Sequence, residues 1–316
     1  MKVIEHIKNA KKTLFSMEVL PPKKGENINN IFDTIEDLLE FNPSFIDVTY
    51  HREELTFVND FKNGNQPKKT RKRPGTVAIS AAIQNRFKID TVPHIICGGF
   101  TKDDTEYALI DLHFLGIDNV LALQGDSLKN EPKFTPLEEG HAYASDLVKQ
   151  IMDMNKGIYL DGLDNAQSTN FCIGVAGYPE KHMDAVSFDQ DIQYLKQKID
   201  FGAEYIVTQM FFDNQKYFDF IKKCKENGIN APIIPGLKPL SSIAQIEALP
   251  KIFHLELPEV LRNEVLKCKT NNSVKELGIE WCIQQSKELM KENVPVLHFY
   301  TMSKAETTRK VAENLF

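Results

Sequence analysis

Polar side chains stand repeatedly where apolar runs of this sequence end. Glu18 lies near the end of LFSMEVL and is followed by two prolines, although burial at the end of a strand raises the cost of a charge. Burying an inward-facing polar group without a partner costs free energy, so a ring of such groups is better explained by one shared ligand than by a separate reason for each residue. The ring that we predict consists of Glu18, Thr49, Tyr50, His94, Gln124, Asp126, Tyr178, Gln209, Lys238, His298, Tyr300 and Thr301.

Several chemistries are disfavoured by the spacing of these residues. The eight histidines form no H-x-x-x-H pair and no His/Cys cluster with ligand spacing, so a metal site is not predicted. No G-x-S-x-G is present to indicate a hydrolase nucleophile. Lys238 lies late in an apolar run, so a cofactor-free lyase or aldolase that uses this lysine stays open as an alternative.

The elements that must position these residues alternate between strand-like and helix-like segments. Eight strand–helix units with continuous apolar strands predict a single-domain α/β fold, a closed (β/α)₈ TIM barrel spanning 1–316, with chemistry at the carboxyl ends of the strands. An open doubly wound sheet is disfavoured because no strand is followed by G-x-G-x-x-G. The predicted strands are 13–20, 45–50, 91–99, 119–126, 170–179, 205–212, 231–239 and 294–302. The predicted helices are 27–41, 76–87, 103–116 with Asp103 as N-cap, 144–154, 189–203, 214–228, 241–249 and 304–316.

Three insertions interrupt this alternation, near 62–75, 157–170 and 258–292, the last of them helical. The first carries a basic cluster, which could hold phosphates but is more typical of a solvated loop. Its members are Lys68, Lys69, Arg71, Lys72 and Arg73.

The composition bounds the class of protein. The 316 residues carry a formal net charge of −6, which argues against a general nucleic-acid binder. Five widely spaced cysteines without C-x-x-C indicate reduced thiols. The charged N-terminus does not resemble a signal peptide, and no apolar run is long enough to span a membrane. We therefore expect a cytoplasmic protein with no nucleic-acid or membrane partner.

Motifs at the strand ends resemble those of the methylenetetrahydrofolate reductase family, in order and along essentially the whole chain. They are FSMEVLPPK, FIDVTY, VPHIIC, LALQGD, YASDLV, AGYPEKH, TQMFFD, IIPGLKP and HFYT. The resemblance implies a barrel that binds FAD noncovalently, takes a hydride from NADH or NADPH, and reduces 5,10-methylenetetrahydrofolate to 5-methyltetrahydrofolate at the same flavin face, feeding methionine synthesis. It also implies a homo-oligomer, and the absence of the eukaryotic regulatory domain from this sequence predicts no inhibition by adenosylmethionine.

The resemblance assigns roles to individual residues. Glu18 matches the catalytic acid, and Asp126 matches the catalytic aspartate between flavin and folate. Gln209, Gln245 and Lys304, together with Asp126, match substrate-binding positions. Positions matching FAD contacts are Thr49, Tyr50, His94, Leu123, Gln124, Gly125, Asp126, Tyr143, Ala144, Tyr178, His182, Asp191, Tyr194, Gln197 and Lys198.

Some positions depart from the family pattern. Gln124 and Gln197 replace common arginines, which leaves the FAD pyrophosphate without those contacts unless Arg52 or the 68–73 cluster compensates. Tyr194 stands for an Asn, Leu249 for a stacking Phe, and Lys304 for an Arg whose bidentate geometry a lysine lacks. These changes are the support for another alternative, a folate- or flavin-binding barrel without turnover.

The implied reaction explains the acid at the first strand end. The folate ring opens only when a ring nitrogen gains a proton, and a desolvated Glu18 would be partly protonated near neutral pH to supply it. Asp126 should stay ionised and favour the cationic intermediate. Gln209, which can donate and accept through one amide, suits two ligands in turn.

Overall fold

The computed structural model describes residues 1–316 apart from 61–63, 129–130 and 132. In this part of the chain, nine parallel strands form one sheet in the order β10-β11-β1-β2-β5-β6-β7-β8-β9. A separate antiparallel pair, β3 and β4, forms a second sheet. The strands are β1 (Leu14–Val19), β2 (Phe45–Val48), β3 (Glu54–Asp60), β4 (Gly64–Thr70), β5 (Asp90–Ile96), β6 (Asn119–Leu123), β7 (Cys172–Gly177), β8 (Tyr205–Thr208), β9 (Ile233–Ile234), β10 (Gly236–Leu237) and β11 (Val296–Tyr300).

The two shortest strands of the large sheet are halves of one barrel strand. Pro235 separates β9 from β10, and it has no N–H to donate to a ladder. The half before it pairs with β8, and the half after it pairs with β11, so this broken strand closes the ring. The predicted (β/α)₈ TIM barrel is therefore confirmed.

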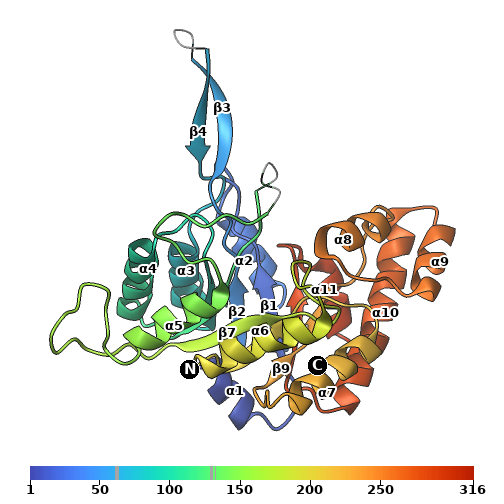
Figure 1. Cartoon of the computed structure of the whole chain (residues 1–316). Helices are drawn as coiled ribbons and strands as arrows, with labels where there is room; N and C mark the ends of the chain where they lie inside the picture. The colour runs from blue at the N-terminus through green and yellow to red at the C-terminus, as the bar shows by residue number, and fades with distance from the viewer. Residues whose placement is uncertain (61–63, 129–130, 132) are drawn as a thin grey trace.

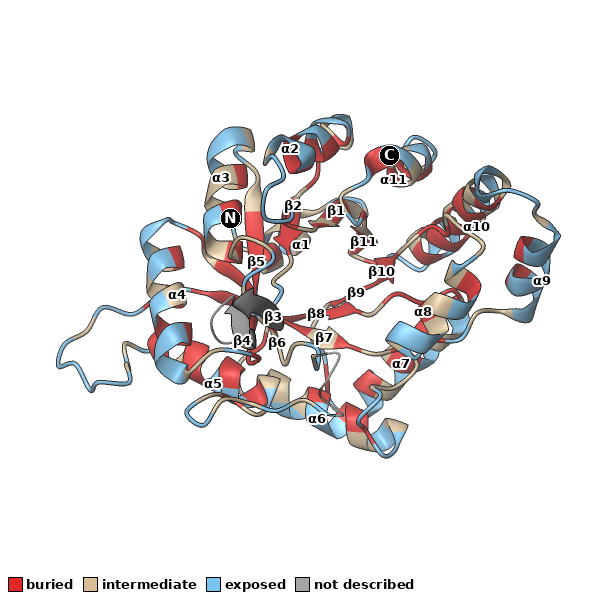
Figure 2. Ribbon diagram, turned by 90° about the horizontal axis from the view of Figure 1, so that it is seen from above, coloured by how far each residue is buried: buried red, intermediate tan, exposed pale blue. Residues whose placement is uncertain are grey.

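Helices surround the ring of strands and cover its outer face (Figure 2). Outward-facing strand residues such as Phe15, Met17 and Val19 pack with helical residues in the main apolar core. The helices are α1 (Val3–Asn9), α2 (Asn29–Glu36), α3 (Thr76–Phe87), α4 (Lys102–Phe114), α5 (Ala144–Met154), α6 (Phe188–Asp200), α7 (Asn214–Glu226), α8 (Gln245–Phe253), α9 (Glu259–Lys267), α10 (Asn271–Lys291) and α11 (Ala305–Ala312), with a short 3₁₀ turn at Leu39–Phe41. No helix of the described residues is long and apolar enough to cross a membrane.

The barrel interior has its own apolar cluster. Phe45, Val92, Leu121 and Tyr205 fill it from four different strands. Val3 of α1 belongs to the same cluster, so this N-terminal helix packs against the amino ends of the strands. The interior is a packed core, and chemistry is left to its carboxyl end.

Most predicted elements agree with the structure to within a few residues, and α3 and α5 agree at both ends. The predicted N-cap of α4 is wrong: Thr101, not Asp103, caps this helix. Its hydroxyl accepts from the N–H of Asp104 at 3.0 Å, and the Asp104 carboxylate accepts from the N–H of Thr101 at 3.0 Å. This reciprocal pair satisfies two free donors at once, which Asp103 inside the first turn cannot do. The helix predicted at 241–249 begins later, at Gln245.

The segment from 63 to 75 is not simply a loop, as the sequence suggested. β3 and β4 pair in register from Glu54–Thr70 to Asp60–Gly64 and form a hairpin that rises beyond the carboxyl end of β2 (Figure 1). Its tip falls on undescribed residues, and the side chains of Lys68 and Lys69 also lie outside the described part. The neighbouring Arg71 and Arg73 are described and contact the Tyr50 hydroxyl and the Pro21 carbonyl.

The segment 258–292 is helical, as its sequence indicates. α8, α9 and α10 enclose a third apolar cluster that includes Leu249, Leu261 and Trp281. α10 contacts both α7 and α11, so it completes the outer ring of helices (Figure 2).

Candidate active site

Glu18 points into the carboxyl end of the barrel. Side chains alternate along β1, so Ser16 and Glu18 face inward while their neighbours face the helices. Both edges of β1 are paired, which places Glu18 beside Asp47 of β2 and Tyr300 of β11. Thr301 donates its hydroxyl to the Glu18 carbonyl at 2.7 Å and fixes the end of the strand. The side chain of Glu18 is 15% exposed, which leaves it accessible from the mouth of the barrel.

His94 lies between two carboxyl groups. Its Nε2 is 3.4 Å from Asp47 Oδ2 and 3.7 Å from Glu18 Oε2. Burial raises the pKa of Glu18 to about 7, against an opposing effect of His94. Burial lowers the pKa of His94, which favours the neutral imidazole. Glu18 therefore has the proton affinity that a general acid needs at neutral pH.

A second buried acid continues this group into the barrel. Burial raises the pKa of Asp47 to about 7, and His298 opposes the shift. The Ser16 hydroxyl and His298 Nδ1 are 2.8 Å apart. Asp47 Oδ1 and His298 Nε2 are buried and have no hydrogen-bond partner among the described residues.

A lysine at the end of β10 lies near Glu18. Lys238 follows β10, and burial lowers its pKa while Glu18 opposes that shift. The like charge of Lys304 also lowers the pKa of Lys238. The Tyr300 hydroxyl donates to the Thr208 carbonyl at 2.6 Å, which ties β11 to β8 across the mouth.

Residues predicted to hold a flavin form the rim on the side of β2 and β6. The Thr49 hydroxyl is buried without a partner among the described residues. Gly125 has a φ of +84°, and a Cβ there would come within 3.2 Å of Ile96, so a side chain would be strained as well as crowded. Gln124 donates its amide to the Ala142 carbonyl at 2.9 Å. Arg52, expected as a compensating cation, is held by Glu131 at 2.8 and 3.1 Å.

Four other predicted residues come together after β7. Lys198 donates to the Ala176 carbonyl at 2.7 Å, and burial lowers its pKa to about 8 against the opposing charge of Asp191. Asp191 accepts from the backbone N–H of His182 at 2.8 Å. The rings of Tyr178 and His182 meet edge to face at 4.6 Å between centroids.

The remaining predicted residues do not form a single cluster. Gln209 and Gln245 accept from nearby backbone N–H groups, of Met210 at 2.9 Å and of Ser241 at 2.7 Å. Leu249 is buried in the apolar cluster of α8–α10. Leu123 and Ala144 are half-buried at an end of β6 and the start of α5, whereas the side chains of Asp126, Tyr143, Tyr194, Gln197 and Lys304 are exposed.

Sequence reasoning missed Asp47. Asp47 lies in the motif FIDVTY, which is predicted as an apolar strand. The signal in the sequence is a single acid within an otherwise apolar run, because a carboxyl group is almost never fully buried without a partner. The structure buries all four residues of β2.

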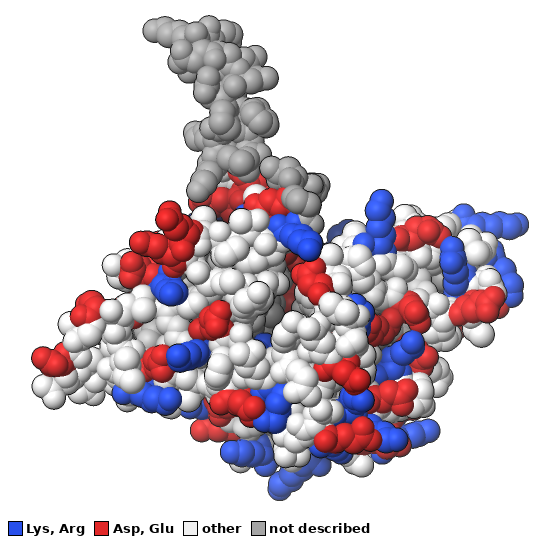
Figure 3. All heavy atoms as spheres, in the orientation of Figure 1, with Lys and Arg blue, Asp and Glu red and all other residues white. Residues whose placement is uncertain are grey.

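Acidic and basic side chains are interspersed over the face shown in Figure 3.

The fold is a (β/α)₈ barrel, and its titratable side chains gather inside the carboxyl end. Barrel proteins of this class have their functional sites at that end.

The family is shown by comparison with known proteins. The family model described as "Methylenetetrahydrofolate reductase" matches residues 2–316. The chain therefore belongs to the methylenetetrahydrofolate reductase family.

Curated relatives and solved structures agree with this placement. The chain is 31% identical to methylenetetrahydrofolate reductase (NADH) 1 of Arabidopsis thaliana, over 100% of this chain and 51% of the relative. It is 28% identical to the Escherichia coli 5,10-methylenetetrahydrofolate reductase, over 95% of this chain and 90% of the relative. The chain thus spans about half the length of the plant relative. An uncharacterised protein from Clostridium thermocellum that binds two copies of 5-methyl-5,6,7,8-tetrahydrofolic acid shares the fold, with a TM-score of 0.59, 16% identity and coverage of 99% and 97%.

Proposed function

We propose that this protein reduces 5,10-methylenetetrahydrofolate to 5-methyltetrahydrofolate with NADH or NADPH as the hydride donor and noncovalently bound FAD. The family match supports the substrate and the reaction. The observation that carries the proposal is Glu18, a carboxyl group inside the barrel mouth whose pKa burial raises to about 7.

The rim of the barrel fits a flavin. The unpartnered Thr49 hydroxyl offers a hydrogen bond, and Gly125 keeps the backbone after β6 open to a close approach. Lys198 is a half-buried lysine beside Asp191, suited to polar or anionic parts of the cofactor. FAD, when bound, would pass a hydride between the nicotinamide donor and the folate, which the side chains of the protein cannot do.

The protein's own residues supply acid, charge and orientation. Glu18 holds a proton for the folate nitrogen whose protonation opens the five-membered ring. Asp126, exposed after Gly125, would favour the cationic form of the substrate. Gln209, Gln245 and Lys304 would bind the folate, the lysine by attraction to its carboxylate tail.

The remaining parts of the proposal concern the setting of the reaction. A cytoplasmic location, a homo-oligomeric state and a role in methionine synthesis stay predictions that the family resemblance supports. So does the division of labour among the fifteen residues assigned to FAD.

Spectroscopy and half-reactions test the proposal. The purified protein should be yellow or should bind added FAD with quenching of the flavin fluorescence. Anaerobic NADH or NADPH should then bleach the flavin, and methylenetetrahydrofolate should restore its colour. A protein that neither contains nor binds FAD contradicts the proposal, and so does a reduced flavin that the folate does not reoxidise.

A further inference from the structure

Asp47 is a buried carboxyl group that the proposed reaction leaves without a task. It lies on β2 in register with Glu18 on β1, and its side chain is 1% exposed. Barrel interiors are filled mainly by branched apolar side chains, and a buried carboxyl group is costly unless it is paired. Its position beside the candidate acid therefore calls for an electrostatic explanation.

The geometry joins Asp47 to Glu18 through one imidazole. His94 Nε2 lies 3.4 Å from Asp47 Oδ2, within hydrogen-bond range, and 3.7 Å from Glu18 Oε2, beyond it. A neutral imidazole that donates from Nε2 thus favours Asp47 as the ionised member of the pair. Glu18 then faces a negative charge on Asp47 and receives no hydrogen bond from His94.

The other charged and titratable groups around the pair are few. Lys238 faces Glu18, and His298 faces Asp47, in each case opposing the effect of burial on the carboxyl pKa. The hydroxyls of Tyr300 and Tyr205 are also close enough to be influenced by Asp47. With both carboxyls ionised, the single charge of Lys238 would leave one buried negative charge in excess, and one bound proton removes that excess.

We infer that Asp47 is a positioning residue that, through His94, keeps Glu18 protonated at neutral pH. The inference rests on the proposed function, in which Glu18 is the proton donor. Two interacting acids titrate as a pair, so the loss of one charge lowers the proton affinity of the other. Burial has the largest effect on the pKa of Glu18 and raises it, His94 opposes that shift, and the charge of Asp47 comes next and raises the pKa as the inference requires.

Infrared titration of the purified protein tests this coupling without folate or nicotinamide. The carboxylic acid C=O band that disappears in Glu18→Gln reports the protonated form of Glu18. In Asp47→Asn, measured against the double variant with Glu18→Gln, the midpoint of this band should fall by about one pH unit, because a like charge has been removed. A midpoint that stays in place or rises overturns the inference. Asp47→Ser removes the same charge and replaces Asp47→Asn if that variant does not fold.

Tyr205→Phe is the matched control. It removes a buried hydroxyl that has no partner among the described residues and that lies near Asp47, without any change of charge. Its midpoint should equal that of the wild type, and a shift as large as that of Asp47→Asn would show that any change in the barrel interior moves the band, which overturns the inference.

Kinetics separate this inference from the proposed function. If the wild type reduces the folate, the apparent pKa in the pH–rate profile of the folate half-reaction should be lower in Asp47→Asn, by the same amount as the infrared midpoint. The pH dependence of flavin reduction should not change. A wild type that reduces the folate with no shift in Asp47→Asn refutes the coupling alone. A shifted infrared band in a protein that does not reduce the folate refutes the proposed function alone.

Discussion

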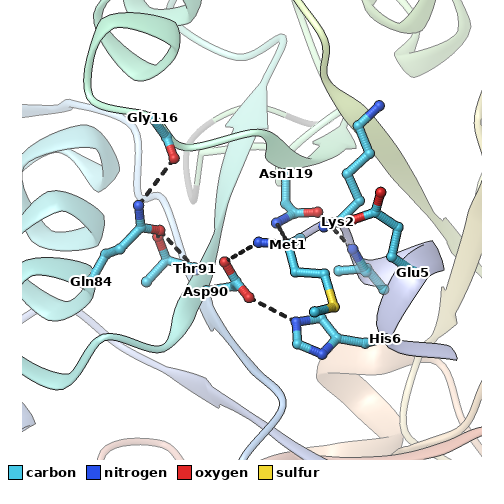
Figure 4. A network of polar contacts seen from close by, with 10 residues as sticks. Met1, Lys2, Glu5, His6, Gln84, Asp90, Thr91, Gly116 and Asn119 are labelled. Carbon is cyan, nitrogen blue, oxygen red and sulfur yellow. Dashed lines mark hydrogen bonds and ion pairs between the residues drawn. The ribbon is translucent and has the colours of Figure 1, made fainter. Parts of the chain in front are cut away.

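The two ends of the barrel hold carboxyl groups of opposite character. At the amino end, Asp90 begins β5 and meets the Met1 ammonium group at 2.6 Å and His6 Nε2 at 2.7 Å (Figure 4). Burial works to raise the pKa of Asp90, but the hydrogen bonds from His6 and Met1 outweigh it and the pKa is lowered. Asn119 adds to this network by accepting from the N–H of Val3 at 2.8 Å.

At the carboxyl end, Glu18 is largely but not fully buried, with the imidazole of His94 3.7 Å away, and burial raises its pKa to about 7. The comparison teaches that burial raises the pKa of a carboxyl group unless hydrogen bonds and ion pairs together outweigh it, as they do at Asp90 and do not at Glu18. A paired acid ties α1 to the barrel, whereas an under-paired acid keeps a proton that it can give away.

The largest expected effect comes from removing the under-paired acid. Glu18→Gln should slow the folate half-reaction by about 10²- to 10⁴-fold, the usual contribution of general acid catalysis, and leave flavin reduction by the nicotinamide donor unchanged. Stopped-flow absorbance of the flavin measures both steps. Asp90→Asn at the other end is the control and should alter neither, and an equal loss of both steps in Glu18→Gln would remove Glu18 from its role as acid.

The same variant should show how much stability the raised pKa of Glu18 costs the folded protein at higher pH. A carboxyl group whose pKa is higher in the folded state binds a proton there that the unfolded chain has lost, so stability falls as pH rises from the unfolded pKa to the folded one. For Glu18 this window runs from 4.5 to about 7. At about 1.4 kcal/mol per unit, Glu18→Gln should gain roughly 3 kcal/mol of unfolding free energy over the wild type between the two limits.

Denaturant unfolding at pH 5 and at pH 8 measures this difference. The advantage of Glu18→Gln should be larger at pH 8. An advantage that does not change with pH would mean that Glu18 ionises in the folded protein as it does in the unfolded chain.

The smallest effect is expected at the paired end. Asp90→Asn removes two partly exposed ion pairs, with the Met1 ammonium group and with His6, so it should cost only about 1 kcal/mol of unfolding free energy at pH 7. Because the folded pKa of Asp90 is lowered, its contribution is present above the unfolded value of 3.8 and disappears as pH falls through the folded value. Unfolding curves of wild type and variant should therefore converge in acid, whereas a gap that persists there would indicate lost packing instead.

Local sequence patterns predicted most strands and helices of the barrel. Other elements depend on contacts between residues far apart in the chain, which local patterns do not contain. The alternation of strand-like and helix-like segments predicts 76–87 and 144–154 as helices, and α3 and α5 have these bounds. The β3–β4 hairpin was missed because its second strand, GNQPKKT, is polar and has none of the β-branched alternation that predicts a strand. The sequence shows a proline at position 235. It does not show that this proline divides the strand that closes the barrel between β8 and β11.

By itself, the sequence determined that Glu18 would stand inside a strand end, since side chains alternate along an extended chain and its neighbours are apolar. Only the tertiary structure decided which groups surround it. Asp47 and His94 reach Glu18 because β1, β2 and β5 pair side by side, and the proton affinity of a buried acid depends on charges a few ångströms away in space, wherever they lie in the chain.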